Sequence, residues 1–252
     1  MRFSEKLKSF RVEEGSIGIG FLGQAGFVFK TADDKMYAVD LYLSNCCERY
    51  FGFKRLMPQI LQPEEIAFDA VISTHAHYDH FDPDSMTALL EDGRTEFIGA
   101  MDTKEECDKL GIQSNVTFLR VGDSIDRNLL RITAVPCDHG KDTPYAIGLL
   151  IEVAGKSVYI MGDTAFRPDY LENPLFQHID LLILPINGAF GNLNEAQAAE
   201  VISILQPKLS IPCHFWNFAE HGGNPGIFQE KMKETSPHCN YLLMYQGEII
   251  TI

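Results

Sequence analysis

Four side chains that bind metal ions well occur within residues 75–80 of the stretch STHAHYDHFD. They are His75, His77, Asp79 and His80, and they follow an apolar run, FDAVISTH at 68–75, that is typical of a strand covered on both faces. In an extended loop alternate residues point to the same side, so His75 and His77 can hold one ion together. Asp79 and His80 can face a second ion position nearby. The cluster therefore predicts a metal site at a strand end. The alternative, that four polar side chains occur together here without a common function, is the weaker interpretation.

Two groups of ligands need further side chains, and the chain offers His139 in PCDHG, Asp163 in MGDT and His214 in IPCHF. Each lies at or just past the C-terminal end of a predicted apolar strand, where loops held by a rigid sheet usually carry sites. Taken singly, a histidine there is more often a hydrogen-bonded structural residue, and the aspartate in GDT suits an ordinary turn. We expect all three to be ligands because the cluster alone leaves the coordination incomplete.

Apolar runs and turn residues alternate along the chain and predict an α/β (α+β) fold. Strands are expected within 16–30, 36–43, 68–75, 96–100, 129–137, 146–155, 156–164, 180–186 and 208–215. Helices are expected over 83–92, with Asp82 as N-cap, over 103–110, ended by Gly111, and over 194–206. No linker divides the chain, so 1–252 is expected to be one domain. Two halves that each run from strands to a helix suggest a four-layer αββα sandwich.

Charge and cysteine usage limit the class of partner. The formal net charge of −14 argues against sequence-blind binding of nucleic acid, which rests on many Lys and Arg side chains. The six cysteines form no C-x-x-C pair. The N-terminal residues show no apolar segment of a signal peptide, and no run reaches the roughly 18 apolar residues that a membrane helix needs. We expect a cytoplasmic protein with free thiols and no membrane partner.

In type and order these residues resemble the metal-binding motifs of the metallo-β-lactamase superfamily. THAHYDH at 74–80 resembles its most specific motif, and Asp40 in AVDLYLS resembles its acidic residue on an early strand. The resemblance extends from FLGQAGFVFK to the C-terminus and implies that superfamily's αββα sandwich. It also implies one or two divalent ions, Zn or Mn first, with Fe and Ni also compatible. By position it assigns His75, His77 and His139 to one ion, Asp79, His80 and His214 to the other, Asp163 as the bridge, and Asp40 behind them, orienting the histidine loop.

Within the superfamily, GIGFLGQAGFVFK, GDTAFRPDY and IPCHFWNF look most similar to the L-ascorbate-6-phosphate lactonase-like branch. The resemblance implies a metal-dependent hydrolase that uses a metal-activated water to open a small anionic substrate, with a sugar-phosphate lactone as the first expectation. Asp79 is the expected catalytic residue, because a carboxylate there can shuttle a proton of the nucleophile besides acting as a ligand.

Substrate contacts are expected from three residues in the later loops. Arg167 follows Asp163 closely and could meet an anion, whereas Asn187 and His221 lie in the glycine-rich loops NGAFGN and EHGGNPG. The 44–65 loop could also cover the site and meet the substrate through its basic side chains, which are Arg49, Lys54 and Arg55. A solvated basic face is an equally good interpretation of that loop.

Three other functions stay open at this point. A ribonuclease Z-like phosphodiesterase is disfavoured by the acidic balance of the chain. A redox di-iron protein of the same fold would need carboxylate-rich ligation and a flavin partner domain. A non-catalytic metal-binding protein is disfavoured by the complete ligand set. The sequence does not decide the metal or the oligomeric state, and a homo-oligomer is compatible with it.

Overall fold

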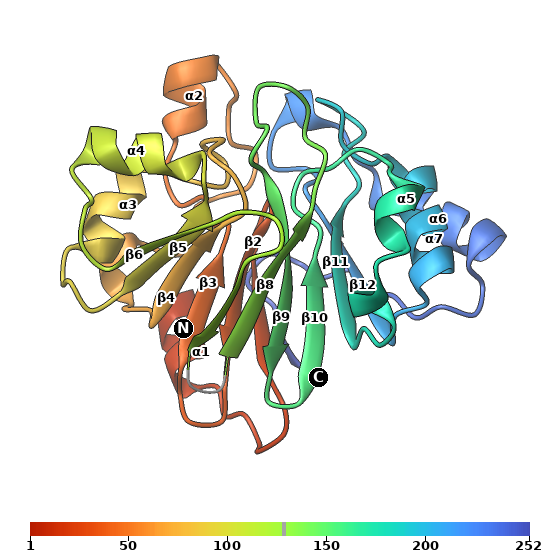
Figure 1. The fold of residues 1–252 in the computed structure, drawn as a ribbon, viewed down its shortest axis with the longest axis horizontal. Coiled ribbons are helices and arrows are strands. Elements are labelled where there is room, and N and C mark those ends of the chain that lie inside the picture. Colours follow the sequence, from red (N-terminus) through yellow and green to blue (C-terminus); the bar gives the residue numbers. More distant parts are fainter. Residues whose placement is uncertain (128–129) are drawn as a thin grey trace.

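The structure is a computed structural model that describes residues 1–127 and 130–252. Two β-sheets lie face to face, and helices cover their outer faces, so that the layers run α-β-β-α (Figure 1). The predicted fold class is confirmed. Within the described residues, no helix combines the length and apolarity needed to cross a bilayer.

The first sheet has the strand order β13-β1-β2-β3-β4-β5-β6. Its strands from β13 to β3 pair antiparallel, whereas those from β3 to β6 are parallel. The bounds are β1 (Gly18–Gly23), β2 (Gly26–Lys30), β3 (Met36–Val39), β4 (Ala70–Ser73), β5 (Glu96–Ala100), β6 (Val116–Leu119) and β13 (Ile249–Thr251). Central β4 is buried along its whole length, as its unbroken apolar sequence requires.

The second sheet has the order β12-β11-β10-β9-β8-β7. Here β10, β11 and β12 are parallel, and the strands from β10 to β7 are antiparallel. The bounds are β7 (Ser124–Arg127), β8 (Leu130–Pro136), β9 (Ile147–Val153), β10 (Lys156–Ile160), β11 (Leu181–Pro185) and β12 (Leu209–Cys213). Inward-facing aliphatic side chains of both sheets, such as Ile72 and Ile132, form the central core.

Helices cover both outer faces. On the first sheet lie α3 (Pro83–Leu90) and α4 (Thr103–Leu110), and on the second lie α5 (Pro168–Leu171), α6 (Glu195–Leu205) and α7 (Pro225–Thr235) (Figure 1). The remaining elements are α1 (Phe3–Ser9), α2 (Cys46–Phe51), η1 (Pro63–Glu65), η2 (Pro174–Phe176) and η3 (Ala219–His221). In Figure 1, α2 stands apart from both helical layers, at the top edge of the sandwich.

Most predicted elements lie where the pattern placed them. β5 and α4 have the predicted bounds, Asp82 caps α3 by accepting the Asp84 N–H at 3.1 Å, and Gly111 ends α4 in the left-handed conformation. The predicted 16–30 strand is broken into β1 and β2, because Gln24 takes a positive φ in a tight turn. The predicted 129–137 strand begins at Leu130 as described, and its first residue, 129, lies outside the described residues.

The C-terminal ends of most strands lie along one edge of the sandwich. β3 and β4 end there in the first sheet, and β8, β10, β11 and β12 end there in the second, because these strands share a direction within each sheet. The sheets meet where the Ile147 N–H donates to the Thr74 carbonyl at 3.0 Å. Gly162, just after β10, permits this approach: it has φ +66°, and a Cβ there would lie 3.1 Å from the Ile147 carbonyl oxygen.

Candidate metal centre

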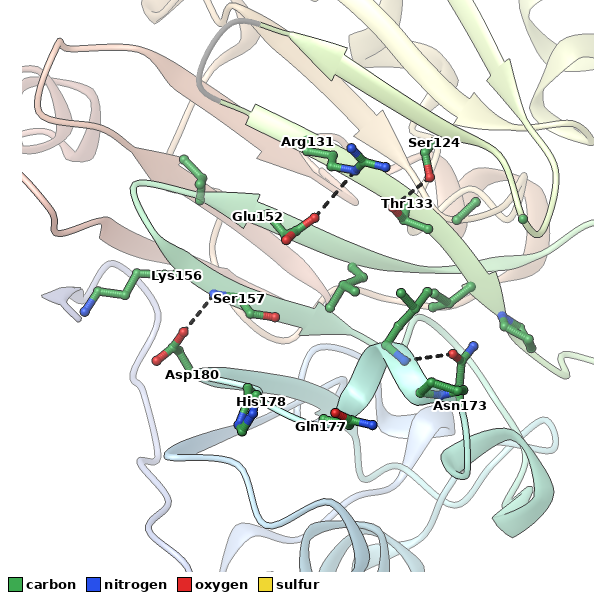
Figure 2. A pocket seen from close by; sticks show the side chains of 18 of the residues that line it. Ser124, Arg131, Thr133, Glu152, Lys156, Ser157, Asn173, Gln177, His178 and Asp180 are labelled. Atoms are coloured by element: carbon green, nitrogen blue, oxygen red, sulfur yellow. Dashed lines mark hydrogen bonds and ion pairs between the residues drawn. The ribbon is translucent and has the colours of Figure 1, made fainter.

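The predicted ligands surround a cavity of about 470 Å³ at this edge, and its lining includes His77, Asp79, His139, Asp163 and His214. A larger depression, about 1010 Å³, lies on the outer face of the second sheet (Figure 2). There several of the polar side chains pair with one another, Arg131 with Glu152 and Ser124 with Thr133. Within the described residues, each trio of His and Asp side chains close enough to share an ion lies at the smaller cavity. The chemistry is therefore concentrated at the strand-end edge.

Asp40 connects the end of β3 to the histidine loop. It is fully buried and lies in the left-handed region, with φ +49°. Its Oδ1 accepts the Thr74 backbone N–H at 2.8 Å, and its Oδ2 accepts the Thr74 hydroxyl at 2.8 Å. The same Oδ2 lies 2.9 Å from Nδ1 of His80. The Nε2 atom of His80 is thereby left to face His214 and Asp163, each at 3.3 Å. Asp40 thus lies behind His80, where the resemblance implies a residue that orients the histidine loop.

The first group of nitrogen atoms belongs to His75, His77 and His139. Nδ1 of His77 lies 3.1 Å from Nε2 of His75 and 3.0 Å from Nε2 of His139. Two of these rings come from the loop after β4 and the third from the loop after β8. Three imidazole nitrogens that converge from two sheets fit a zinc-like ion, because such an ion takes ligands of this kind in close mutual contact.

The second group combines imidazoles with carboxylates. Nε2 of His214 lies 3.2 Å from Oδ2 of Asp79, 3.1 Å from Oδ2 of Asp163 and 3.3 Å from Nε2 of His80. Asp163 also lies 3.3 Å from His80 through Oδ1 and 3.8 Å from His139 through Oδ2. The position of Asp163 between the two groups matches the bridging place that the resemblance implies.

Charge differs between the two groups. Burial lowers the pKa of His75 and His77, and it lowers the pKa of His139 to about 4, so the first group offers neutral nitrogens. Burial also opposes the charged form of His214, but Asp163 and Asp79 outweigh it and raise the pKa of His214 to about 9. The second group is thus held together by attraction between carboxylate and imidazolium. A divalent cation can take the place of such protons, so this donor set fits a metal.

Gln24 and His221 meet at the second group. Nε2 of Gln24 lies 2.8 Å from Oδ2 of Asp79 and 2.9 Å from Nδ1 of His221. The His221 ring stacks on His214 at 4.9 Å, and with Asp79 and His214 it forms a third trio that could hold an ion. His221 was expected to contact substrate, and it does line the cavity. Gln24 was not predicted, although a lone amide inside the apolar run GIGFLGQAGFVFK was a signal that could have found it.

Arg167 and Asn187 do not line the cavity as described. The Arg167 guanidinium binds Asp138 at 2.6 Å and Asp169 at 2.7 Å, and it stacks on Tyr170. Two carboxylates therefore occupy the donors that an anionic substrate would need. Asn187 follows β11 and is buried, and its loop instead carries Phe190 into the lining. The expected substrate contacts of Arg167 and Asn187 find no support in these interactions.

The 44–65 loop covers the site, but with apolar side chains. Its contributions to the cavity are Cys47, Phe51 and Phe53. Arg49 binds Asp84 at 2.8 Å, and Arg55 donates to the Tyr42 carbonyl and stacks on the Tyr42 ring. Of the two interpretations left open for this loop, contact between its basic side chains and an anion finds no support: Arg49 binds Asp84 at the surface, Arg55 binds the buried Tyr42, and Lys54 is absent from the lining.

Known proteins share both the sequence pattern and the fold. The family described as the beta-lactamase superfamily domain matches residues 18–214. A UPF0173 metal-dependent hydrolase of Thermococcus onnurineus is 27% identical over 76% of this chain and 85% of its own. Another from Carboxydothermus hydrogenoformans is 27% identical over 84% of this chain and 91% of its own. The narrower resemblance to the L-ascorbate-6-phosphate lactonase-like branch stays a prediction.

Solved structures agree at the level of the fold. Igni18, a metallo hydrolase of Ignicoccus hospitalis, superposes with a TM-score of 0.76 at 20% identity and covers 94% of this chain and 98% of its own. A possible metal-dependent hydrolase of Veillonella parvula superposes with a TM-score of 0.77 at 16% identity, over 93% of this chain and 99% of its own. Because the family match spans most of the chain, from β1 to His214, the chain belongs to the metallo-β-lactamase superfamily.

Proposed function

We propose that the protein is a metal-dependent hydrolase of a small molecule. One observation carries the proposal: seven His and Asp side chains from four strand ends converge at one edge of the sandwich, where five of them line a cavity and His75 and His80 lie buried behind it. We assign His75, His77 and His139 to one ion, Asp79, His80 and His214 to a second, and Asp163 to both. The distances within the two groups and the position of Asp163 between them support this division.

A divalent ion held by these residues would supply an acidified water and a Lewis acid for the carbonyl under attack. Asp40 orients His80 through Nδ1, so the ring can bind only through Nε2. Asp79 lies in the cavity lining, where Gln24 donates to its Oδ2 at 2.8 Å. Burial raises the pKa of Asp79, but His80 and His214 outweigh it and hold that pKa well below its usual range, so the carboxylate is ionised and can accept a proton from the attacking water.

The reaction that suits these groups is ester or lactone hydrolysis. One water is consumed: its oxygen bonds to the acyl carbon, the C–O bond to the leaving alcohol breaks, and Asp79 passes a proton to the leaving oxygen. A carboxylate, an alcohol and one released proton result. A sugar-phosphate lactone belongs to this class and is kept as a test substrate. Its phosphate would need a cationic partner away from the ions, however, and the lining side chains offer none.

The direct test combines metal analysis with hydrolysis. Elemental analysis of the purified protein is run beside assays on lactones, simple esters, phosphodiesters and a β-lactam. We expect bound divalent metal and turnover of a lactone or ester. His77→Ala and Asp163→Asn should lower kcat/KM by about 100-fold or more in folded protein, because each removes a ligand. His178→Ala, at an exposed histidine beside the outer depression, is the matched control.

Three results would count against the proposal. Full activity in Asp163→Asn would show that the assigned bridge is not needed. Metal-loaded protein that hydrolyses none of the substrate classes would favour a non-catalytic metal-binding protein. Turnover of phosphodiesters alone would favour the phosphodiesterase alternative.

A further inference from the structure

Four aromatic side chains form a continuous wall on one side of the cavity. The aromatic wall consists of Phe51, Phe53, Tyr78 and Phe190, all of which line the cavity. Ring centroids lie 5.6 Å apart between Phe51 and Tyr78, 6.1 Å between Phe51 and Phe53, and 5.8 Å between Phe53 and Phe190. These spacings are those of rings in mutual contact. Three segments far apart in sequence therefore build one apolar surface.

The aromatic wall reaches the proposed metal centre. The His221 ring lies 5.5 Å from Phe53 and 5.2 Å from Phe190, both edge to face. His221 in turn stacks on His214, a proposed ligand, at 4.9 Å. A molecule whose reacting bond lies over the second group of ligands would thus place its remainder against these rings. The wall is part of the same site and not a separate surface.

Two side chains of the aromatic wall, Phe51 and Phe190, are in positions that are energetically unfavourable for the protein without a ligand. The exposed fractions of Phe51 and Phe190 are 56% and 59%, although both are large apolar side chains. Phe190 also has φ +54°, a backbone conformation that is unfavourable for a bulky residue. Neither feature contributes to the buried core. A ligand that covers these rings would remove their apolar surface from water and so offset this unfavourable free energy. Exposed apolar surface in a concave site usually marks a ligand-binding site.

In the part of the chain that the structure describes, the one lining side chain that carries positive charge is His214, and Asp79 and Asp163 already pair with it. The lining includes no Lys or Arg, whereas Asp142 adds a carboxylate to it. Arg49 binds Asp84 and Arg167 binds Asp138, so both guanidinium groups already have carboxylate partners. The ions themselves would interact with the reacting carbonyl. A negatively charged group remote from that carbonyl would therefore meet rings and a carboxylate, and no counter-charge.

From this arrangement we infer that the substrate is uncharged and carries a planar apolar group, such as a benzene ring, next to the hydrolysable bond. The inference rests on the proposed function and specifies its substrate class. The cavity volume of about 470 Å³ suits a ligand of one or two rings, since small-molecule sites span roughly 300–1,000 Å³. The aromatic group stacks on the wall, and the ester or lactone carbonyl faces Asp79 and His214.

The first experiment compares lactones that share the reacting group. Dihydrocoumarin has a benzene ring fused to the lactone that δ-valerolactone lacks, and a sugar-phosphate lactone has a remote anion instead. Each kcat/KM of the metal-loaded protein, followed by proton release, is divided by the rate constant of that lactone with hydroxide. We expect the normalised value for dihydrocoumarin to exceed that for δ-valerolactone by about tenfold, because ring burial against aromatics has that magnitude. A preference for the sugar-phosphate lactone would overturn the inference.

Substitutions in the aromatic wall test whether its rings cause the preference for dihydrocoumarin. Phe51→Ala and Phe190→Ala should each lower the ratio between dihydrocoumarin and δ-valerolactone by about fivefold, mainly through KM. Both side chains are more than half exposed, so their removal leaves the core intact. Phe190→Arg should instead raise the relative rate on the sugar-phosphate lactone. Tyr245→Ala is the matched control, since Tyr245 is 65% exposed and lies outside the cavity lining. An unchanged ratio in both alanine variants contradicts the inference.

A binding measurement separates this inference from the proposed function. Benzohydroxamate and acetohydroxamate both chelate divalent ions and differ in the ring. In calorimetric titrations of metal-loaded protein, we expect the first to bind about tenfold more tightly, and Phe51→Ala to remove most of the difference. If benzohydroxamate binds more tightly but no lactone or ester is hydrolysed, the proposed hydrolase function is wrong and the inference that the aromatic wall binds a ring is supported. Equal affinities for the two hydroxamates, together with measurable hydrolysis, would contradict the inference about the aromatic wall and leave the proposed hydrolase function unaffected.

Discussion

Asp40 holds His80 in one orientation: Oδ2 of Asp40 lies 2.9 Å from Nδ1 of His80, and both side chains are fully buried. The same carboxylate accepts two hydrogen bonds from Thr74, so the end of β3 positions the whole histidine loop after β4. A carboxylate behind a histidine ligand determines which ring nitrogen is free and increases its basicity.

Asp40→Asn should weaken metal binding by about 10–100-fold, the usual effect of changing a partner behind a ligand. An amide can serve as acceptor for Thr74, but it cannot satisfy both the Thr74 donors and Nδ1 of His80. The affinity is measured by competition with a chelator of known strength, and circular dichroism checks that the variant folds. Wild-type affinity in this variant would show that His80 needs no such partner.

Gln24→Met should lower kcat/KM by about tenfold or more while metal content stays near that of the wild type. Methionine has a similar volume but cannot donate to Oδ2 of Asp79, so the carboxylate loses a bond that favours its ionised form. The acidic limb of the pH–rate profile should therefore move to higher pH, which a merely structural role would not cause. Gln24→Glu should be worse, because it adds a carboxylate beside Asp79. An unshifted profile in Gln24→Met would contradict this role.

Metal uptake should release protons at pH 7. Asp163 and Asp79 raise the pKa of His214 to about 9, above the pH of the experiment, so the ion must displace a proton. The release should decline as the pH rises through about 9. It is measured by titration calorimetry in buffers of different ionisation enthalpy. Apparent enthalpies that do not depend on the buffer would argue against this prediction.

The same pKa has a consequence for the metal-free protein. The pKa of His214 is higher in the folded protein than its ordinary value of 6.5, so protonation of His214 stabilises the fold, and this contribution is complete below pH 6.5. The contribution is lost as the pH rises through about 9. We therefore expect the Tm of the metal-free protein to fall over this window, and His214→Gln to make the fall shallower. A Tm that rises between pH 6.5 and about 9 would contradict the raised pKa of His214.

Gly162→Ala should destabilise the protein more than Gly155→Ala. Both glycines have positive φ, +66° and +72°, so each substitution costs about 1 kcal/mol or more from the backbone. A Cβ at Gly155 meets nothing within 4 Å, whereas at Gly162 it would lie 3.1 Å from the Ile147 carbonyl and 3.3 Å from Cβ of Thr74. Urea unfolding of both variants measures the difference. Equal losses would mean that the contact between β10 and the histidine loop relaxes freely.

Local pattern was enough to predict where β5, α3 and α4 lie, because apolar periodicity, an Asp N-cap and a C-terminal glycine are properties of short segments. It did not predict α2 or the division of the first strand run at Gln24. A positive φ at a non-glycine residue depends on what surrounds it, and the Gln24 carbonyl here accepts the N–H of His214, far along the chain.

The sequence by itself determined the type and order of the side chains at the candidate centre, since a dense run of His and Asp after an apolar strand has few other uses. Tertiary structure decided what surrounds them. It placed Gln24 and His221 at the second group, turned Arg167 and Arg49 toward carboxylates, and brought Phe51 and Phe190 over the cavity. Those outcomes depend on which strand ends and loops meet across two sheets, and that choice is set by packing of the whole core rather than by any local segment.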